Sequence, residues 1–99
     1  MATAPIASFA PTAAVEIAVT STSGRAVIPT TGTPTIALVT NLGPSPVFVA
    51  LGSSSVTVAI GGGVVILPGA QLALTIGANT NIAAITLSGV AGLNLAVGT

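Results

Sequence analysis

The chain has 99 residues and no His, Cys, Trp or Tyr, and only Glu16 and Arg25 carry a charged side chain. This inventory lacks a paired acid and base, an activated nucleophile, a set of metal ligands and the row of cations that binds nucleic acid. We therefore expect a single domain that is not an enzyme and that uses no cofactor, metal or nucleic-acid partner.

Residues 1–13 differ from the rest of the chain and are predicted to form an extended N-terminal arm. Pro5 and Pro11 oppose a regular helix or a central strand, whereas Ile6 and Phe9 are apolar. Two interpretations stay open: a disordered terminus, or an arm that docks Ile6 and Phe9 on a neighbouring subunit. Phe9 is one of only two aromatic residues, so it is the expected anchor in the second case.

Residues 14–99 are predicted to form one all-β domain. Val, Ile and Thr make up 35 of the 99 residues, and these β-branched side chains favour strands. Residues alternate with a period of two in short segments separated by turns rich in Gly, Pro, Asn and Ser. The predicted strands cover residues 15–19, 25–28, 35–40, 47–51, 56–60, 64–66, 72–76, 82–87 and 93–97. Eight or nine strands at this spacing favour an antiparallel β-sandwich of the jelly-roll type, with about eight strands.

The two charged residues lie on consecutive predicted strands. Glu16 and Arg25 are therefore expected to face each other across an antiparallel pair. An exposed pair of this kind contributes about 0–1 kcal/mol. The alternative is an ion pair between subunits that fixes their register.

One face of the predicted strands carries Val, Ile and Leu, and the other carries small uncharged side chains. The large aliphatic set is expected to form the core. The small face is either exposed to solvent or packed closely against a neighbouring subunit, and the sequence favours neither. The residues of the small face are Ala18, Ala37, Ala50, Ala59, Ala73, Thr75, Ala83, Asn94 and Ala96.

Two turns stand out. Pro44 and Pro46 belong to a turn cluster over residues 41–46. Gly61, Gly62 and Gly63 are predicted to form a flexible hairpin tip. Consecutive glycines also occur in phosphate-binding loops, but neither the lysine nor the following helix of such a loop is present.

The composition also predicts association. Hydrophobic residues are 52% of the chain and its net charge is zero, whereas a folded chain of this size buries only about 63% of its surface. The apolar excess must lie on the surface, so we expect other chains to cover it, copies of this chain among them. No apolar stretch approaches the roughly 20 residues of a membrane span, and the N-terminus has no basic region of a signal peptide. We expect a product of the cytoplasm with no membrane partner.

Three segments resemble small structural proteins of tailed-bacteriophage particles. These segments are residues 41–52 (NLGPSPVFVALG), residues 67–69 (LPG) and residues 81–89 (NIAAITLSG), in this order. They are turn and strand motifs that carry no chemistry. The resemblance covers about residues 25–98, and the chain departs from it in being poorer in charge.

The resemblance implies a β-sandwich capsid decoration (cement) protein. Such proteins bind the major capsid protein on the outer surface of the head shell, often as homotrimers, and stabilise it. The loops at Pro44–Pro46 and Gly61–Gly63 are then expected to touch the shell, and Ile6 and Phe9 a neighbouring subunit. The first alternative is a tail, neck or head-fibre component of the same virion. The second is a host-surface or glycan-binding module, which the absence of Trp and Tyr opposes.

Overall fold

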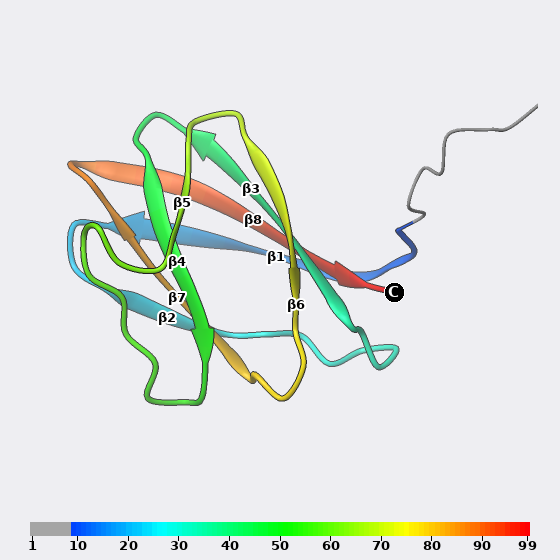
Figure 1. The fold of residues 1–99 in the computed structure, drawn as a ribbon. Helices are drawn as coiled ribbons and strands as arrows, with labels where there is room; N and C mark the ends of the chain where they lie inside the picture. The colour runs from blue at the N-terminus through cyan, green and yellow to red at the C-terminus, as the bar shows by residue number, and fades with distance from the viewer. Residues whose placement is uncertain (1–8) are drawn as a thin grey trace, which may run out of the picture.

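Eight strands form two antiparallel sheets of four in the computed structural model, which describes residues 9–99 (Figure 1). Within these residues there is no helix. The first sheet has, in spatial order, β1 (Pro11–Thr20), β8 (Val90–Gly98), β3 (Ile36–Gly43) and β6 (Gln71–Thr75). The second sheet has β2 (Gly24–Val27), β7 (Asn81–Thr86), β4 (Val47–Gly52) and β5 (Val64–Ile66). The prediction of an all-β fold with about eight antiparallel strands is confirmed.

The main core lies between the two sheets. Val39 and Leu95 of the first sheet and Val47 and Val49 of the second are completely buried in one hydrophobic cluster. These residues stand at alternate positions of their strands, because successive side chains of a strand point to opposite faces of the sheet. The period-two alternation of the sequence therefore located this core in β4.

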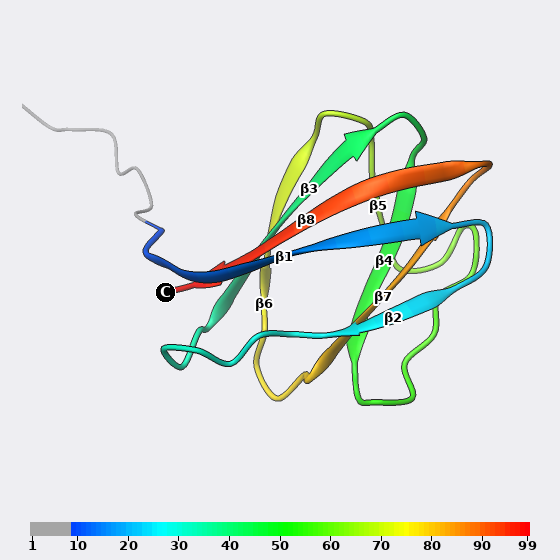
Figure 2. The ribbon, with the colours of Figure 1, turned by 180° about the vertical axis from the view of Figure 1, so that it is seen from behind.

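The strands run antiparallel, so the loops gather at two ends of the fold (Figures 1 and 2). The β1–β2, β3–β4, β5–β6 and β7–β8 connections share one end. The β2–β3 and β6–β7 connections share the other end with the start of β1 and the C-terminus. Each of these connections passes from one sheet to the other, whereas β4 and β5 are neighbours in the second sheet.

The strand predicted over residues 56–60 is absent. Residues 53–63 form a loop between β4 and β5 that lies over the outer face of the second sheet. Val58 is buried there against Ala83 and Ile85 of β7, in a small second core. Arg25 Nη1 donates a hydrogen bond to the Val56 carbonyl oxygen (3.1 Å), and Val58 N donates one to Ser23 Oγ (3.1 Å). The alternation of this segment thus reflects packing on a sheet, without strand pairing.

The N-terminal boundary also differs from the prediction. Strand β1 begins at Pro11 and pairs with β8 from Gly98 onward, so residues 11–13 belong to the sheet and not to the arm. A proline is compatible with this position because it is the first residue of a strand at the sheet edge, where its missing N–H costs no ladder hydrogen bond. Residues 1–8 of the predicted arm, with Ile6, lie outside the described residues.

Candidate functional site

An apolar surface covers the end of the fold where four inter-sheet connections meet. Four large hydrophobic side chains are more than half exposed there: Leu42 (58%), Leu67 (58%), Leu87 (51%) and Val90 (62%). They lie on or beside the β3–β4, β5–β6 and β7–β8 connections, together with the exposed Pro44 and Pro68. We call these six residues the apolar end.

Backbone contacts hold the three connections of the apolar end together. Leu87 N donates a hydrogen bond to the Pro46 carbonyl oxygen (3.2 Å), and Gly69 N donates one to the Asn41 carbonyl oxygen (2.8 Å). A Cβ atom added at Gly92 would meet the Leu42 side chain at 3.6 Å. The loops that carry the exposed side chains of the apolar end are therefore held together by hydrogen bonds and packing.

Asn41 is the buried polar residue that links these loops. Its side chain is completely buried, and its Nδ2 donates hydrogen bonds to the carbonyl oxygens of Ser45 and Ile66, both at 2.8 Å. Its Oδ1 accepts a hydrogen bond from Gly43 N at 2.7 Å. One amide thus links β3, the β3–β4 turn and β5. Sequence analysis missed this role, because an Asn before a Gly-Pro pair reads as an ordinary turn residue.

Further exposed aliphatic residues lie in and beside β5, the edge strand of the second sheet. Val64 and Val65 are 42% and 49% exposed, and Ile60 in the preceding loop is 50% exposed. No charged residue lies in β5 or in the connections of the apolar end. Large exposed apolar patches mark surfaces that other molecules cover. The chemistry that this part of the fold offers is burial of aliphatic side chains.

The predicted shell contacts lie in different surroundings. Pro44 is exposed and Pro46 half-buried in the β3–β4 turn, so both belong to the neighbourhood of the apolar end. Gly61, Gly62 and Gly63 end the long β4–β5 loop and are not a tip between two strands, because residues 56–60 form no strand. A Cβ atom at Gly63 would overlap the Val49 carbonyl oxygen, so this glycine permits close approach of two backbones.

We expect Gly63→Ala to lower the free energy of unfolding by at least about 2 kcal/mol, because it combines this overlap with a φ of +62°. Gly61→Ala is the matched control: Gly61 has a φ of +85°, but a Cβ atom there meets nothing within 4 Å. The control is expected to cost about 1 kcal/mol. Urea unfolding of both variants measures the difference, and equal costs would contradict the close approach at Gly63.

The predicted cross-strand pair of Glu16 and Arg25 is wrong. Glu16 lies in the first sheet opposite Asn94, whereas Arg25 lies in the second sheet opposite Ala83. The chain passes from one sheet to the other between β1 and β2, so these consecutive strands are not paired. Both side chains are exposed. The alternative role, a pair between subunits, stays a prediction.

The small-residue face is confirmed in part. Ala18, Ala73, Thr75, Asn94 and Ala96 lie on the outer face of the first sheet, exposed or half-buried. The other four residues of that prediction lie elsewhere. Ala37 points into the main core, and Ala59 is in the long loop. Ala50 and Ala83 lie beneath that loop on the second sheet. The predicted small-residue face is therefore wrong for Ala37, Ala50, Ala59 and Ala83.

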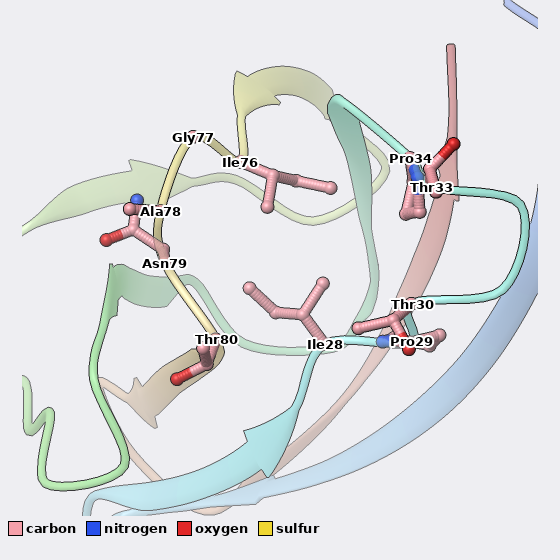
Figure 3. A pocket seen from close by; sticks show the side chains of 10 residues that line it. All are labelled: Ile28, Pro29, Thr30, Thr33, Pro34, Ile76, Gly77, Ala78, Asn79 and Thr80. Atoms are coloured by element: carbon pink, nitrogen blue, oxygen red, sulfur yellow. The ribbon is translucent and has the colours of Figure 1, made fainter.

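The opposite end of the fold holds a pocket of about 260 Å³ (Figure 3). The β2–β3 and β6–β7 connections form it, and the side chains of Ile28 and Ile76 point into it between them. No functional role was predicted from the sequence for either connection. Phe9, the predicted anchor of the arm, is half-buried at this same end. The residues that line the pocket are Ile28, Pro29, Thr30, Thr33, Pro34, Ile76, Gly77, Ala78, Asn79 and Thr80.

Comparisons with protein-family models, curated proteins and solved structures found no match to this chain. Among residues 9–99, no helix is present that is long and apolar enough to cross a membrane.

Proposed function

We propose that this chain is a structural protein of a bacteriophage particle, a capsid decoration protein that binds the outer surface of the head shell and stabilises it. The observation that supports this proposal is the apolar end, a cluster of exposed aliphatic side chains on a chain with two charged residues. A permanent partner that covers this cluster removes it from water, and permanent interfaces are more hydrophobic than transient ones. In this role the chain is a building block and not an enzyme, and its partner is the major capsid protein.

The size of the apolar end favours attachment through several copies. Full burial of a Leu or Val side chain contributes roughly 1.5–3 kcal/mol, so the exposed half of each side chain contributes about 1 kcal/mol. Association itself costs about 4–15 kcal/mol in lost freedom of motion. The four aliphatic side chains of one copy offset only part of that cost. A homo-oligomer, for which we propose a trimer, binds through several apolar ends at once and gains avidity.

The strand order supports a finer description of the fold, which we propose to be a jelly roll. The antiparallel pairs β1–β8, β2–β7, β3–β6 and β4–β5 are nested within one another along the chain. Such nesting is what results when one long hairpin of four strand pairs folds over into two sheets. Jelly rolls with eight strands in two sheets occur in viral capsid domains.

The number of copies in purified particles tests the proposed function. Particles of the phage that encodes this chain are purified, and the chain is quantified by mass spectrometry against the major capsid protein. A decoration protein is expected in hundreds of copies per particle. Tens of copies or fewer would replace the head location by the alternative of a tail, neck or head-fibre component. Absence from the particles would overturn the proposal.

A further inference from the structure

The pocket at the end opposite to the apolar end has the size and the apolar lining to hold an aliphatic side chain. Ile28 and Ile76 are 2% and 6% exposed and form its apolar floor, and Pro29 and Pro34 stand at its wall (Figure 3). Its volume of about 260 Å³ lies below the range of about 300–1,000 Å³ that holds most small-molecule ligands. It suits one or two side chains of a peptide.

Residues 9 and 10, the first that the structure describes, lie at this same end. Ala10 and Thr99 exchange two backbone hydrogen bonds, of 2.9 and 3.1 Å, that continue the β1–β8 ladder to its last pair. Thr12, two residues further along, contacts Gly32 in the β2–β3 connection that lines the pocket. Thr35 N also donates a hydrogen bond to the Gly98 carbonyl oxygen (2.8 Å), which fixes that connection beside the end of β8.

We propose that Ile6 of one copy binds in this pocket of a second copy. Ile6 is the only large aliphatic residue other than Met1 among residues 1–8, and Pro5 before it favours an extended backbone. The fixed φ of Pro5 lowers the conformational entropy that this segment loses on binding. Thr30 and Asn79 at the pocket provide hydroxyl and amide groups for its backbone.

The geometry favours a second copy over the chain's own pocket. The ladder carries Ala10 outward beyond the end of the first sheet, and four residues span at most about 14 Å from Ala10 to Ile6. No residue between Ile6 and Ala10 is Gly, Asn or Asp, so turn types that need a positive φ are disfavoured within those four residues.

This contact rests on the proposed homo-oligomer and gives it a specific interface, which lies at the end of the fold away from the apolar end. It therefore predicts self-association of the purified chain without any particle. Self-association is measured without heads, so failure of this contact and failure of shell binding are distinguishable.

Disulfide trapping between separate chains tests the proposal, because the natural chain has no cysteine. An Ile6→Cys chain labelled with heavy isotopes is mixed with an unlabelled Ala78→Cys chain, whose position lines the pocket. The control mixture pairs Ile6→Cys with Gln71→Cys, at an exposed position near the apolar end. After mild oxidation, we expect at least about tenfold more mixed dimer from the Ala78 mixture than from the control, by intact mass.

Two outcomes would overturn the proposal. One is an equal yield of mixed dimer from both mixtures. The other is a double variant, Ile6→Cys with Ala78→Cys, that closes only an internal disulfide, which would place the segment in its own pocket. Ala78 is exposed and lies outside both hydrophobic clusters. Circular dichroism of each variant is expected to match that of the natural chain.

Discussion

Replacing Asn41 by alanine is expected to lower the free energy of unfolding by about 3–5 kcal/mol, the largest effect on stability that we expect from a single side chain. The substitution removes the amide that donates hydrogen bonds to the carbonyl oxygens of Ser45 and Ile66 and accepts one from the N–H of Gly43. These groups lie around a completely buried side chain, and a buried polar group that loses its partner costs about 1–3 kcal/mol. The cavity left by the amide adds to this cost.

Asn94→Ala is the matched control for this prediction. Asn94 lies half-buried on the outer face of the first sheet, where water replaces lost contacts. We expect its replacement to change stability by less than about 0.5 kcal/mol. Urea unfolding followed by circular dichroism suits this chain, which has no Trp or Tyr for fluorescence. A cost below about 1 kcal/mol for Asn41→Ala would show that the loops of the apolar end do not depend on this side chain.

The double variant Leu42→Asp/Leu67→Asp is expected to weaken binding to phage heads at least about 100-fold, which corresponds to about 2.7 kcal/mol. Both leucines are 58% exposed, so the fold tolerates the change, but the proposed contact loses about 1 kcal/mol of apolar burial at each site. Two carboxylates must also leave water on binding, which costs several kcal/mol when they find no partner.

The control carries the same two charges on another surface. Ala73→Asp/Thr75→Asp places them on β6, on the exposed outer face of the first sheet. This variant is expected to bind heads within about threefold of the natural chain. Co-sedimentation with heads that lack the chain measures both affinities. Equal losses would assign the effect to charge alone and remove the apolar end as the contact surface.

Alternation in the sequence predicted burial better than it predicted strand pairing. Val47 and Val49 alternate and lie in the main core, as expected. Val56 and Val58 alternate equally well, yet they pack on the outer face of the second sheet from a loop. A period of two reports that alternate residues face an apolar surface; it does not report whether the backbone finds a ladder partner.

The pairing of strands could not be read from neighbouring segments. The predicted contact between Glu16 and Arg25 assumed that consecutive strands pair, which holds for about two-thirds of neighbouring elements. In this fold β1 pairs with β8, so Glu16 lies opposite Asn94, a residue near the other end of the chain. Such long-range partners are decided when the whole chain folds into its two sheets, and neighbouring segments do not reveal them.

The apolar end was predicted only through its prolines. Pro44 and Pro46 marked a turn of interest, but Leu42 was only a member of that turn cluster and Leu67 only the residue before Pro68, and neither was predicted to be exposed. The register of β3 explains the exposure of Leu42: Ala37, Val39 and the polar Asn41 face inward, which turns Leu42 outward. A buried Asn at a core position reverses the expected hydrophobic pattern, and composition alone gives no sign of it.

Co-sedimentation of the natural chain with heads that lack it, from the phage that we propose encodes it, tests the central claim most directly: this nearly uncharged fold is held on a larger shell by its aliphatic side chains. Attachment through apolar burial is little screened by salt, unlike attachment through ion pairs. We therefore predict saturable binding of hundreds of copies per head that persists from about 0.05 to 1 M NaCl. A chain that stays in the supernatant at every salt concentration would contradict the claim.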